Sequence, residues 1–218
     1  MSKLTWDQTG EKFYETGIEQ VALYVQKSGA YEKGVAWNGI TALNLTPSGA
    51  EPTALYANNK KYITLMSVEE LGGTIEAFTY PDEFAACDGS EELSPGVFIG
   101  QQSRATFGLV GKTLIGNDSD GTKHGYKLHI IYGCLASPSE KANSTVNDSP
   151  EAQTMSWEFS TTPVSVGTDG KTTSYICIDS TKVDAEKLAT LEATLYGSES
   201  EEASLPTPDA IAAIFAAA

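Results

Sequence analysis

The segment Gly111-Lys112-Thr113 contains the last residues of a phosphate-binding loop, in which backbone amides and a lysine hold the phosphates of a nucleotide. That motif also needs a glycine at the position of Thr106, and it needs a helix directly after the loop. Here the segment lies inside an apolar, strand-like run from Leu109 to Ile115. We therefore expect no nucleotide site.

Asn117 to Gly121 carries oxygen-bearing side chains at the close spacing that suits a calcium loop. An EF-hand is excluded, because Gly116 and Lys127 would stand at its first and last ligand positions. The composition is that of a tight turn. A weak cation contact at Asp118 and Asp120 is the alternative.

The histidines His124 and His129 are five residues apart, which places their side chains on opposite faces of a strand. They are therefore not predicted to share a metal ion. The sequence has no G-x-S-x-G nucleophile elbow. A catalytic carboxylate pair forms in space, so the 29 acidic residues carry no information about one. We expect no cofactor, no metal and no enzymatic activity.

The three cysteines, Cys87, Cys134 and Cys177, are far apart and form no C-x-x-C motif, so neither a zinc knuckle nor a redox pair is indicated. No apolar export signal follows Lys3, which fits reduced thiols in a bacterial cytosol. Cys134 and Cys177 lie in apolar strand-like runs. We expect both to be core residues.

The net charge of −15 argues against a nucleic-acid-binding surface, because phosphate binding needs clustered Lys and Arg. Residues 62–103 contain eight acidic residues and no Lys or Arg. Residues 183–218 contain seven acidic residues and one base, Lys187. Such a distribution suits solubility and equally suits a surface that repels DNA.

The chain of 218 residues is long enough for one large domain, and it contains no apolar run of the roughly 18 residues that a membrane span needs. We divide it into three parts. Residues 1–17 are predicted to be an N-terminal arm that docks on another surface. Residues 18–180 are predicted to be a mainly β domain, and residues 181–218 a helix, an acidic linker and a C-terminal helix.

The β domain is predicted from apolar runs separated by turn residues. Leu109 to Ile115 and Tyr126 to Leu135 flank the turn at 116–121 and form a hairpin or meander. Gln153 to Val166 alternates most cleanly, and we expect it to form a hairpin with Ser174 to Ile178.

Residues 46–61, TPSGAEPTALYANNKK, are predicted to be a long loop, because they contain prolines, a glycine, asparagines and lysines. A loop this long in a compact domain is usually functional or disordered. A second, acidic loop is predicted at 88–96.

The C-terminal part has two helix signals. Asp184 caps a helix that runs to Tyr196 with Leu188, Leu191 and Leu195 on one face, and Gly197 ends it. Thr207-Pro208-Asp209 starts a second helix. Its apolar stripe either covers the chain's own core or docks on a neighbour, and the candidate docking residues are Ile211, Ile214 and Phe215.

Several blocks of the sequence resemble the major tail tube proteins of long-tailed, non-contractile (siphovirus-type) bacteriophages. The main block is GQQSR followed by FGL-x-x-x-TLIGND within residues 100–118. Two further blocks are FTYPDEFAACDGS at 78–90 and MSWEFSTTPV at 155–164. Near the C-terminus LATLEATLYG and LPTPDAIAAIF also match. The resemblance spans most of the chain from about residue 65 onward.

The resemblance implies a β-sandwich or open barrel of the tail tube type with a flanking helix and a helical C-terminal tail. It implies a structural virion protein that is assembled in the host bacterial cytoplasm. Six copies form a ring, the rings stack into a hollow tube, and strands of all six copies line a channel through which viral DNA passes without specific binding. The implied partners are other copies of the chain, the tape-measure protein, and the tail tip and tail terminator proteins. No membrane is involved.

Two surfaces follow from this resemblance as expectations. The family's long loop between early strands packs against the next ring, and the corresponding candidates are Pro47, Pro52, Leu55, Tyr56, Asn58, Asn59 and Lys60. A channel wall must be polar while its other face packs, and the lumen-facing candidates are Thr154, Ser156, Glu158 and Ser160.

A carbohydrate- or receptor-binding β-sandwich of a phage tail is the main alternative. Such a module would expose Trp and Tyr side chains that stack on sugars. Trp6, Trp37 and Trp157 are scattered, and the last two stand in runs that look buried. An enzyme is the third alternative, and only the abundance of carboxylates suggests it.

Overall fold

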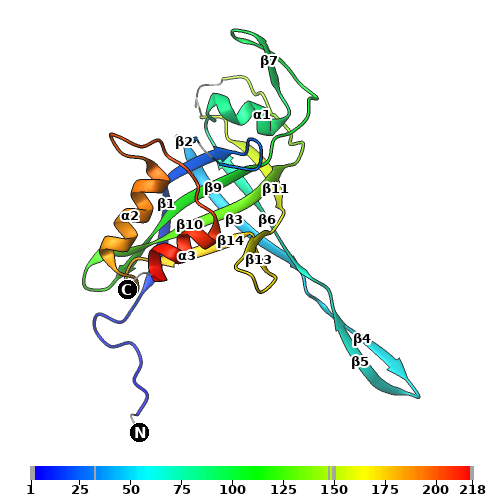
Figure 1. Ribbon diagram of the computed structural model, residues 1–218, viewed down its shortest axis with the longest axis vertical. Helices are drawn as coiled ribbons and strands as arrows, with labels where there is room; N and C mark the ends of the chain where they lie inside the picture. The colour runs from blue at the N-terminus through cyan, green and yellow to red at the C-terminus, as the bar shows by residue number, and fades with distance from the viewer. Residues whose placement is uncertain (1–2, 32, 147, 149–150, 217–218) are drawn as a thin grey trace.

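The structure, a computed structural model, describes residues 3–31, 33–146, 148 and 151–216 (Figure 1). Strands make up 48% and helical residues 13%, which confirms the mainly β fold. One antiparallel sheet dominates. Its path is β2 (Gly34–Ala36), β1 (Tyr14–Val25), β9 (Phe107–Asn117), β10 (Gly121–Ala136), β11 (Met155–Thr161), β6 (Glu69–Ala77) and β3 (Ile40–Gly49), with β14 (Tyr175–Asp179) paired to β10 beside this path.

The hairpin predicted around residues 116–121 is present as β9 and β10. Its turn is held by Asn117, whose Oδ1 accepts hydrogen bonds from the backbone N–H groups of Ser119 at 3.1 Å and Asp120 at 2.5 Å. This is an Asx-type turn, in which a side chain replaces a backbone acceptor. The oxygen-rich composition of the segment therefore builds the turn.

The second edge of β10 has two successive partners. Residues 127–131 pair with β14, and residues 134–136 pair with β11. Between them Gly133 adopts φ +64°, and a Cβ at this position would lie 2.1 Å from the carbonyl oxygen of Thr162. Only glycine fits this conformation and this contact. We call this point the fork, because the sheet divides here into two layers.

The predicted pairing of 153–166 with 174–178 is wrong in its main part. Strands β11 and β14 lie one after the other along the same edge of β10 and do not pair with each other. Only the short connecting strands β12 (Val164–Val166) and β13 (Lys171–Thr173) form a hairpin. The alternation of the sequence fits both arrangements, because it says which face is buried and not which strand is the neighbour.

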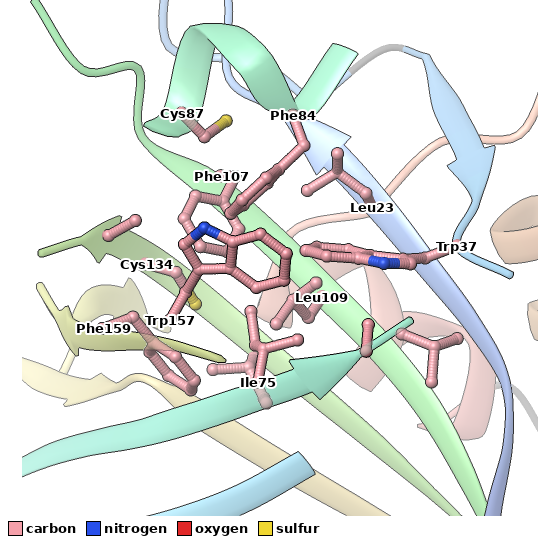
Figure 2. Packing of buried hydrophobic residues seen from close by; sticks show 14 residues of the cluster. Leu23, Trp37, Ile75, Phe84, Cys87, Phe107, Leu109, Cys134, Trp157 and Phe159 are labelled. Atoms are coloured by element: carbon pink, nitrogen blue, oxygen red, sulfur yellow. The ribbon is translucent and has the colours of Figure 1, made fainter. Parts of the chain in front are cut away.

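The main core lies between the two layers. Trp157 of β11 is 1% exposed, and its ring centroid lies 5.2 Å from that of Phe84 and 5.8 Å from that of Trp37 (Figure 2). Phe107 and Phe159 close the cluster at edge-on angles. Phe84 comes from the short helical segment η1 (Asp82–Phe84), which continues as α1 (Ala85–Asp88), so this segment plugs one end of the layers.

A second core lies on the outer face of β1, β9 and β10, beneath the helices α2 (Ala185–Tyr196) and α3 (Pro208–Ala216). Asp184 caps α2 as predicted, with its carboxylate accepting from the N–H groups of Glu186 and Lys187. The hydroxyl of Tyr24 donates to the carbonyl of Leu195 at 2.5 Å. The same face buries the predicted helical stripe Leu188, Leu191 and Leu195.

Two element boundaries differ from those predicted. The N-terminal arm ends earlier than residue 17, because β1 already begins at Tyr14 and pairs with β9. The acidic segment 88–96 is not a loop throughout, since β7 (Glu91–Ser94) and β8 (Val97–Ile99) form a hairpin. Gly72 and Gly73 lie inside β6. A Cβ on Gly73 would stand 2.3 Å from the carbonyl of Asn44, so glycine here permits a close strand approach.

Gly133→Ala is expected to lower the free energy of unfolding by about 2–4 kcal/mol, because the new methyl group meets a backbone carbonyl and the backbone conformation is strained. The matched control is Gly167→Ala. Gly167 has φ +63° but open space around it, so it reports the conformational cost alone, about 1 kcal/mol. Urea denaturation of both variants measures the difference. Equal losses would contradict the fork as a steric constraint.

Candidate assembly and channel surfaces

The segment predicted as the long loop 46–61 is instead part of a β-hairpin that projects from the body (Figure 1). Strand β3 runs through Pro47 to Gly49, and β4 (Pro52–Ala57) then pairs with β5 (Lys60–Met66). Asn58 and Asn59 form the turn with φ +50° and +63°, as a two-residue hairpin turn requires. The loop prediction is wrong because proline is tolerated on an edge strand and paired asparagines are hairpin turn residues.

We call residues 50–68 the hairpin arm. Its strands carry large apolar side chains on both faces, and none of them is buried: Leu55, Tyr56, Tyr62, Ile63, Leu65, Met66 and Val68 are 44–83% exposed. An isolated two-stranded hairpin is marginally stable in water. Exposed apolar surface of this kind is typical of segments that bind a protein, a membrane or a ligand. Of the predicted inter-ring residues, Pro52 to Lys60 lie on this arm, and Pro47 lies in β3 at its base.

The alternation predicted for residues 154–160 is present in β11. Trp157 and Phe159 are buried in the core, whereas Thr154, Ser156, Glu158 and Ser160 are exposed. The structure brings further polar side chains beside them that sequence reasoning missed. In register with Ser156, Glu158 and Ser160 lie Glu76, Thr74 and Gly72 of β6, and beyond these lie Ala42, Asn44 and Thr46 of β3.

This three-stranded surface, which we call the polar face, is the outer side of the layer formed by β11, β6 and β3. No Lys or Arg occurs in any of the three strands, and Glu76 and Glu158 are its charged members at the centre. The polar face therefore presents hydroxyl, amide and carboxylate groups and no cation. In contrast, the outer side of the other layer is apolar and lies beneath α2 and α3.

The sheet ends in two edges. Among the described residues, β3 has a strand partner on one side only, and β1 pairs with β2 only through residues 22–24. The free part of β1 is irregular, since Gly17 and Gln20 have positive φ and the register with β9 shifts twice. We call this irregular part of β1 the seam. A cavity of about 640 Å³ lies beside it and is lined by residues 18–22, residues 34–40 and the end of α2. Free strand edges are sites where further strands add.

The N-terminal arm is attached to the β9–β10 turn. Asp118 accepts hydrogen bonds from the N–H groups of Gly10 at 3.0 Å and Lys12 at 3.4 Å, and the Phe13 ring lies 5.0 Å from that of His124. Asp118 is therefore occupied by backbone donors. Further out, Leu4 and Trp6 are each 73% exposed.

The C-terminal helix covers the chain's own core. Ile211 is 4% exposed, and Ile214 and Phe215 pack against the same cluster beneath α2 and α3. Of the two alternatives for this stripe, the structure places it on its own chain. A partner would therefore meet the outer side of α3 and not these three side chains.

The cysteines divide differently from the expectation. Cys134 is buried as predicted, but Cys177 is exposed, and that prediction was wrong. In β14 the neighbouring Ile178 takes the buried position beneath α2, so Cys177 points to the opposite side. Burial raises the pKa of the Cys87 thiol to about 12 and that of Cys134 well above its ordinary value, which makes both poor nucleophiles.

The lysine of the Gly111-Lys112-Thr113 segment has partners within the chain. Lys112 lies 3.1 Å from the Glu192 carboxylate and over the Tyr126 ring, so it packs under α2 instead of facing a phosphate. Within the described ranges, no group of three or more His, Cys, Asp or Glu could hold a metal ion. No helix in the described part of the chain is both long enough and apolar enough to cross a membrane.

The two histidines occupy separate sites. His124 lies 3.3 Å from the Asp120 carboxylate. His129 hydrogen-bonds through Nε2 to the Thr113 hydroxyl at 2.7 Å and through Nδ1 to the Tyr175 hydroxyl at 2.6 Å. Both of its nitrogens are therefore occupied within the sheet.

The aromatic side chains are divided between the core and projecting segments. Trp37 and Trp157 are 3% and 1% exposed, in the core. The exposed aromatic residues instead stand on projecting segments, such as Trp6 on the N-terminal arm, Tyr56 and Tyr62 on the hairpin arm, and Phe98 on β8. Their distribution fits contacts with several neighbouring surfaces better than one stacking site.

No protein-family model and no curated protein matches this sequence.

Stability is expected to fall as the pH falls below about 6.5. Burial lowers the pKa of His129 below its ordinary value of 6.5, so the unfolded chain takes up the proton before the folded chain does. The stabilisation is complete above pH 6.5 and is lost as the pH falls towards the lowered folded-state pKa. Urea denaturation at several pH values measures the slope, which should be smaller in His129→Gln.

The matched control is His124→Gln. It keeps His129 and should therefore keep the part of the stability loss at low pH that comes from His129. An unchanged slope in His129→Gln would show that the folded protein does not disfavour the His129 cation.

Proposed function

We propose that this chain is the subunit of the tail tube of a long-tailed, non-contractile bacteriophage. Six copies form a ring, and rings stack into a hollow tube with a largely acidic lumen for DNA passage. The observation that carries the proposal is the division of the outer surface. One layer of the sheet is covered by helices, whereas the other leaves a polar face without cations exposed over three strands.

The polar face suits a channel wall. Its alternate residues anchor in the aromatic core through Trp157 and Phe159, so the wall is rigid. It carries Glu76 and Glu158 and gives DNA phosphates no Lys or Arg to bind. Charges act on passing DNA within about 8 Å at physiological salt. The wall therefore acts by its smoothness and its negative sign, and the mechanism of passage is passive.

Ring closure is supported by the two edges of the sheet. The free edge of β3 and the seam at β1 lie close to each other, since Ile40 of β3 and residues 18–22 of β1 line the same cavity. They are still two different edges, so a contact between β3 of one copy and β1 of the next is heterologous. Such contacts close into rings when the rotation between copies divides a full turn. Pairing of strand edges would also satisfy the backbone groups that each monomer exposes there.

Stacking is supported by the hairpin arm. A ring contact is repeated once per subunit, so many modest apolar contacts add to a stable stack without covalent bonds. The arm has apolar side chains on both faces and no partner within the described part of its own chain. In this proposal it reaches the next ring, as expected for the residues from Pro47 to Lys60.

The proposed protein is structural and not an enzyme, needs no cofactor, and is located in the virion tail after assembly in the host cytoplasm. Its partners are other copies of itself, the tape-measure protein inside the channel, the tail tip protein at one end and the terminator protein at the other. The sequence blocks at 78–90, 100–118 and 155–164, which resemble tail tube proteins, support this assignment.

Removal of the hairpin arm should abolish stacking and leave the monomer folded. Residues 50–68 are replaced by Asn-Gly, which joins the paired residues Gly49 and Glu69 through a two-residue turn. No side chain of the large cores is lost, so the melting temperature should change by at most a few degrees. Electron microscopy at high concentration, alone and with added tail tips, should show tubes for the full chain only. Tubes formed by the shortened chain would contradict the role of the arm.

Reversal of charge on the polar face should make the tube retain DNA. Tubes of Glu76→Lys/Glu158→Lys are expected to co-sediment with short DNA duplexes at low salt and release them at high salt, because a channel surrounds the duplex with cations. The matched control, Glu199→Lys/Glu201→Lys, changes the same charge on the linker after α2 and should retain much less DNA. Equal retention by the two variants would argue against the polar face as the channel wall.

A further inference from the structure

The tip of the hairpin arm carries the only two adjacent cations of a chain whose net charge is −15. These are Lys60 and Lys61, directly after the turn. Both are exposed, and within the described residues neither lies in an ion pair. Tyr56 and Tyr62 flank them and are 72% and 78% exposed. The tip is therefore a basic and aromatic surface on an acidic molecule.

A groove that complements this tip lies beside the β7–β8 hairpin, and we call it the crown groove. It has a volume of about 530 Å³ and an apolar part made by Val25, Ala85, Ala86 and Phe98. Phe98 and its neighbours Leu93 and Val97 on this hairpin are 51–66% exposed. The hairpin thus leaves an apolar surface uncovered at the groove.

The rim of the crown groove is acidic. Its charged residues are Asp82, Glu83, Glu91, Glu92 and Glu202, against Lys27 and Lys33. Among the described residues none of these acids has a cationic partner within ion-pair distance, and Glu92 accepts only the backbone N–H of Gly96. The groove therefore joins apolar surface with an unneutralised negative charge.

Figure 1 shows the hairpin arm and the β7–β8 hairpin at opposite ends of the molecule. A chain cannot reach its own groove across the body, but a second copy can. A contact between opposite ends of two copies is heterologous. When such a contact is repeated and does not close into a ring, it generates an open filament with two different ends. The relative placement therefore selects another copy of this chain as the occupant.

We propose that the arm tip of one copy inserts into the crown groove of the next copy along the tube axis. Lys60 and Lys61 pair with the acidic rim around Glu91 and Glu92, and the tyrosines of the tip pack on Phe98. The crown groove is thus the surface that receives the arm of the neighbouring ring, an inference that rests on the proposed function. Because the tip is positively charged and the groove is negatively charged, the contact also fixes the direction in which the tube grows. Two tips repel each other, so tip-to-tip encounters are disfavoured.

A charge-swap experiment on the full chain tests the contact. The tip variant is Lys60→Glu/Lys61→Glu, and the groove variant is Glu91→Lys/Glu92→Lys. The control Lys123→Glu/Lys171→Glu makes the same change of charge at two exposed lysines elsewhere. Sedimentation measures the protein concentration at which half of the chain is assembled. The tip and groove variants should each raise it at least about tenfold, and their combination should restore it, because the pairs re-form with exchanged signs.

A carbodiimide cross-linking measurement on mixed normal and isotopically labelled wild-type chains covers the case in which assembly is incomplete. Amide bonds between a lysine at 60–61 of one chain and an acid at 82–92 of another support the proposal. Assembly without these cross-links, or a combined variant that is not restored, overturns the proposal and leaves the proposed function standing. Absence of both assembly and cross-links at high concentration, with tail tips added, contradicts both.

Discussion

The structure depends on the change of partner along β10. At Gly133 the strand turns from β14 to β11, and the positive φ and the close Thr162 carbonyl leave room for no side chain. Beyond Gly133, residues 134–136 of β10 pair with β11. From β11 the sheet continues through β6 to β3, and these three strands fold back over β9. The main aromatic core lies between the two layers, and the surface of the second layer becomes an independent wall. The fork therefore lets one continuous sheet form both layers around the main core.

The outer faces of the two layers differ: one is buried under helices and the other is exposed. This difference connects packing with the proposed function. The first layer packs its outer apolar face under α2 and α3, where the Tyr24 hydroxyl and the capped helix fix the arrangement. The second layer is bare outside, polar and without cations. Apolar surface that the monomer does not bury is concentrated on projecting segments, above all on the hairpin arm. A subunit of a tube needs this combination, since it must present one wall to the channel and bury its projections in neighbours.

Much of the fold could be predicted from local patterns, because those patterns report burial. The alternation in β11, the β9–β10 hairpin and the capped helix α2 are present as expected, since each depends on residues near in sequence. Strand neighbours could not be predicted in the same way: the fork rests on a contact between Gly133 and Thr162, which no period reveals. The prolines and lysines of the hairpin arm are typical of a loop, and only the Asn58-Asn59 pair indicates the hairpin turn. The exposure of Cys177 could not be predicted, because an apolar run does not say which of its two faces is covered. The polar face was half predicted, since β11 shows it in sequence, but the contributions of β6 and β3 require the register.

The most direct test of the central claim is a cryo-electron microscopy map of wild-type particles assembled at high concentration or on tail tips. The account predicts closed rings of six copies stacked into a tube, with the face that contains Ser156, Glu158 and Glu76 lining the channel and α2 and α3 turned away from it. Particles with the helices inside, or a protein that forms no closed ring under either condition, would contradict the account.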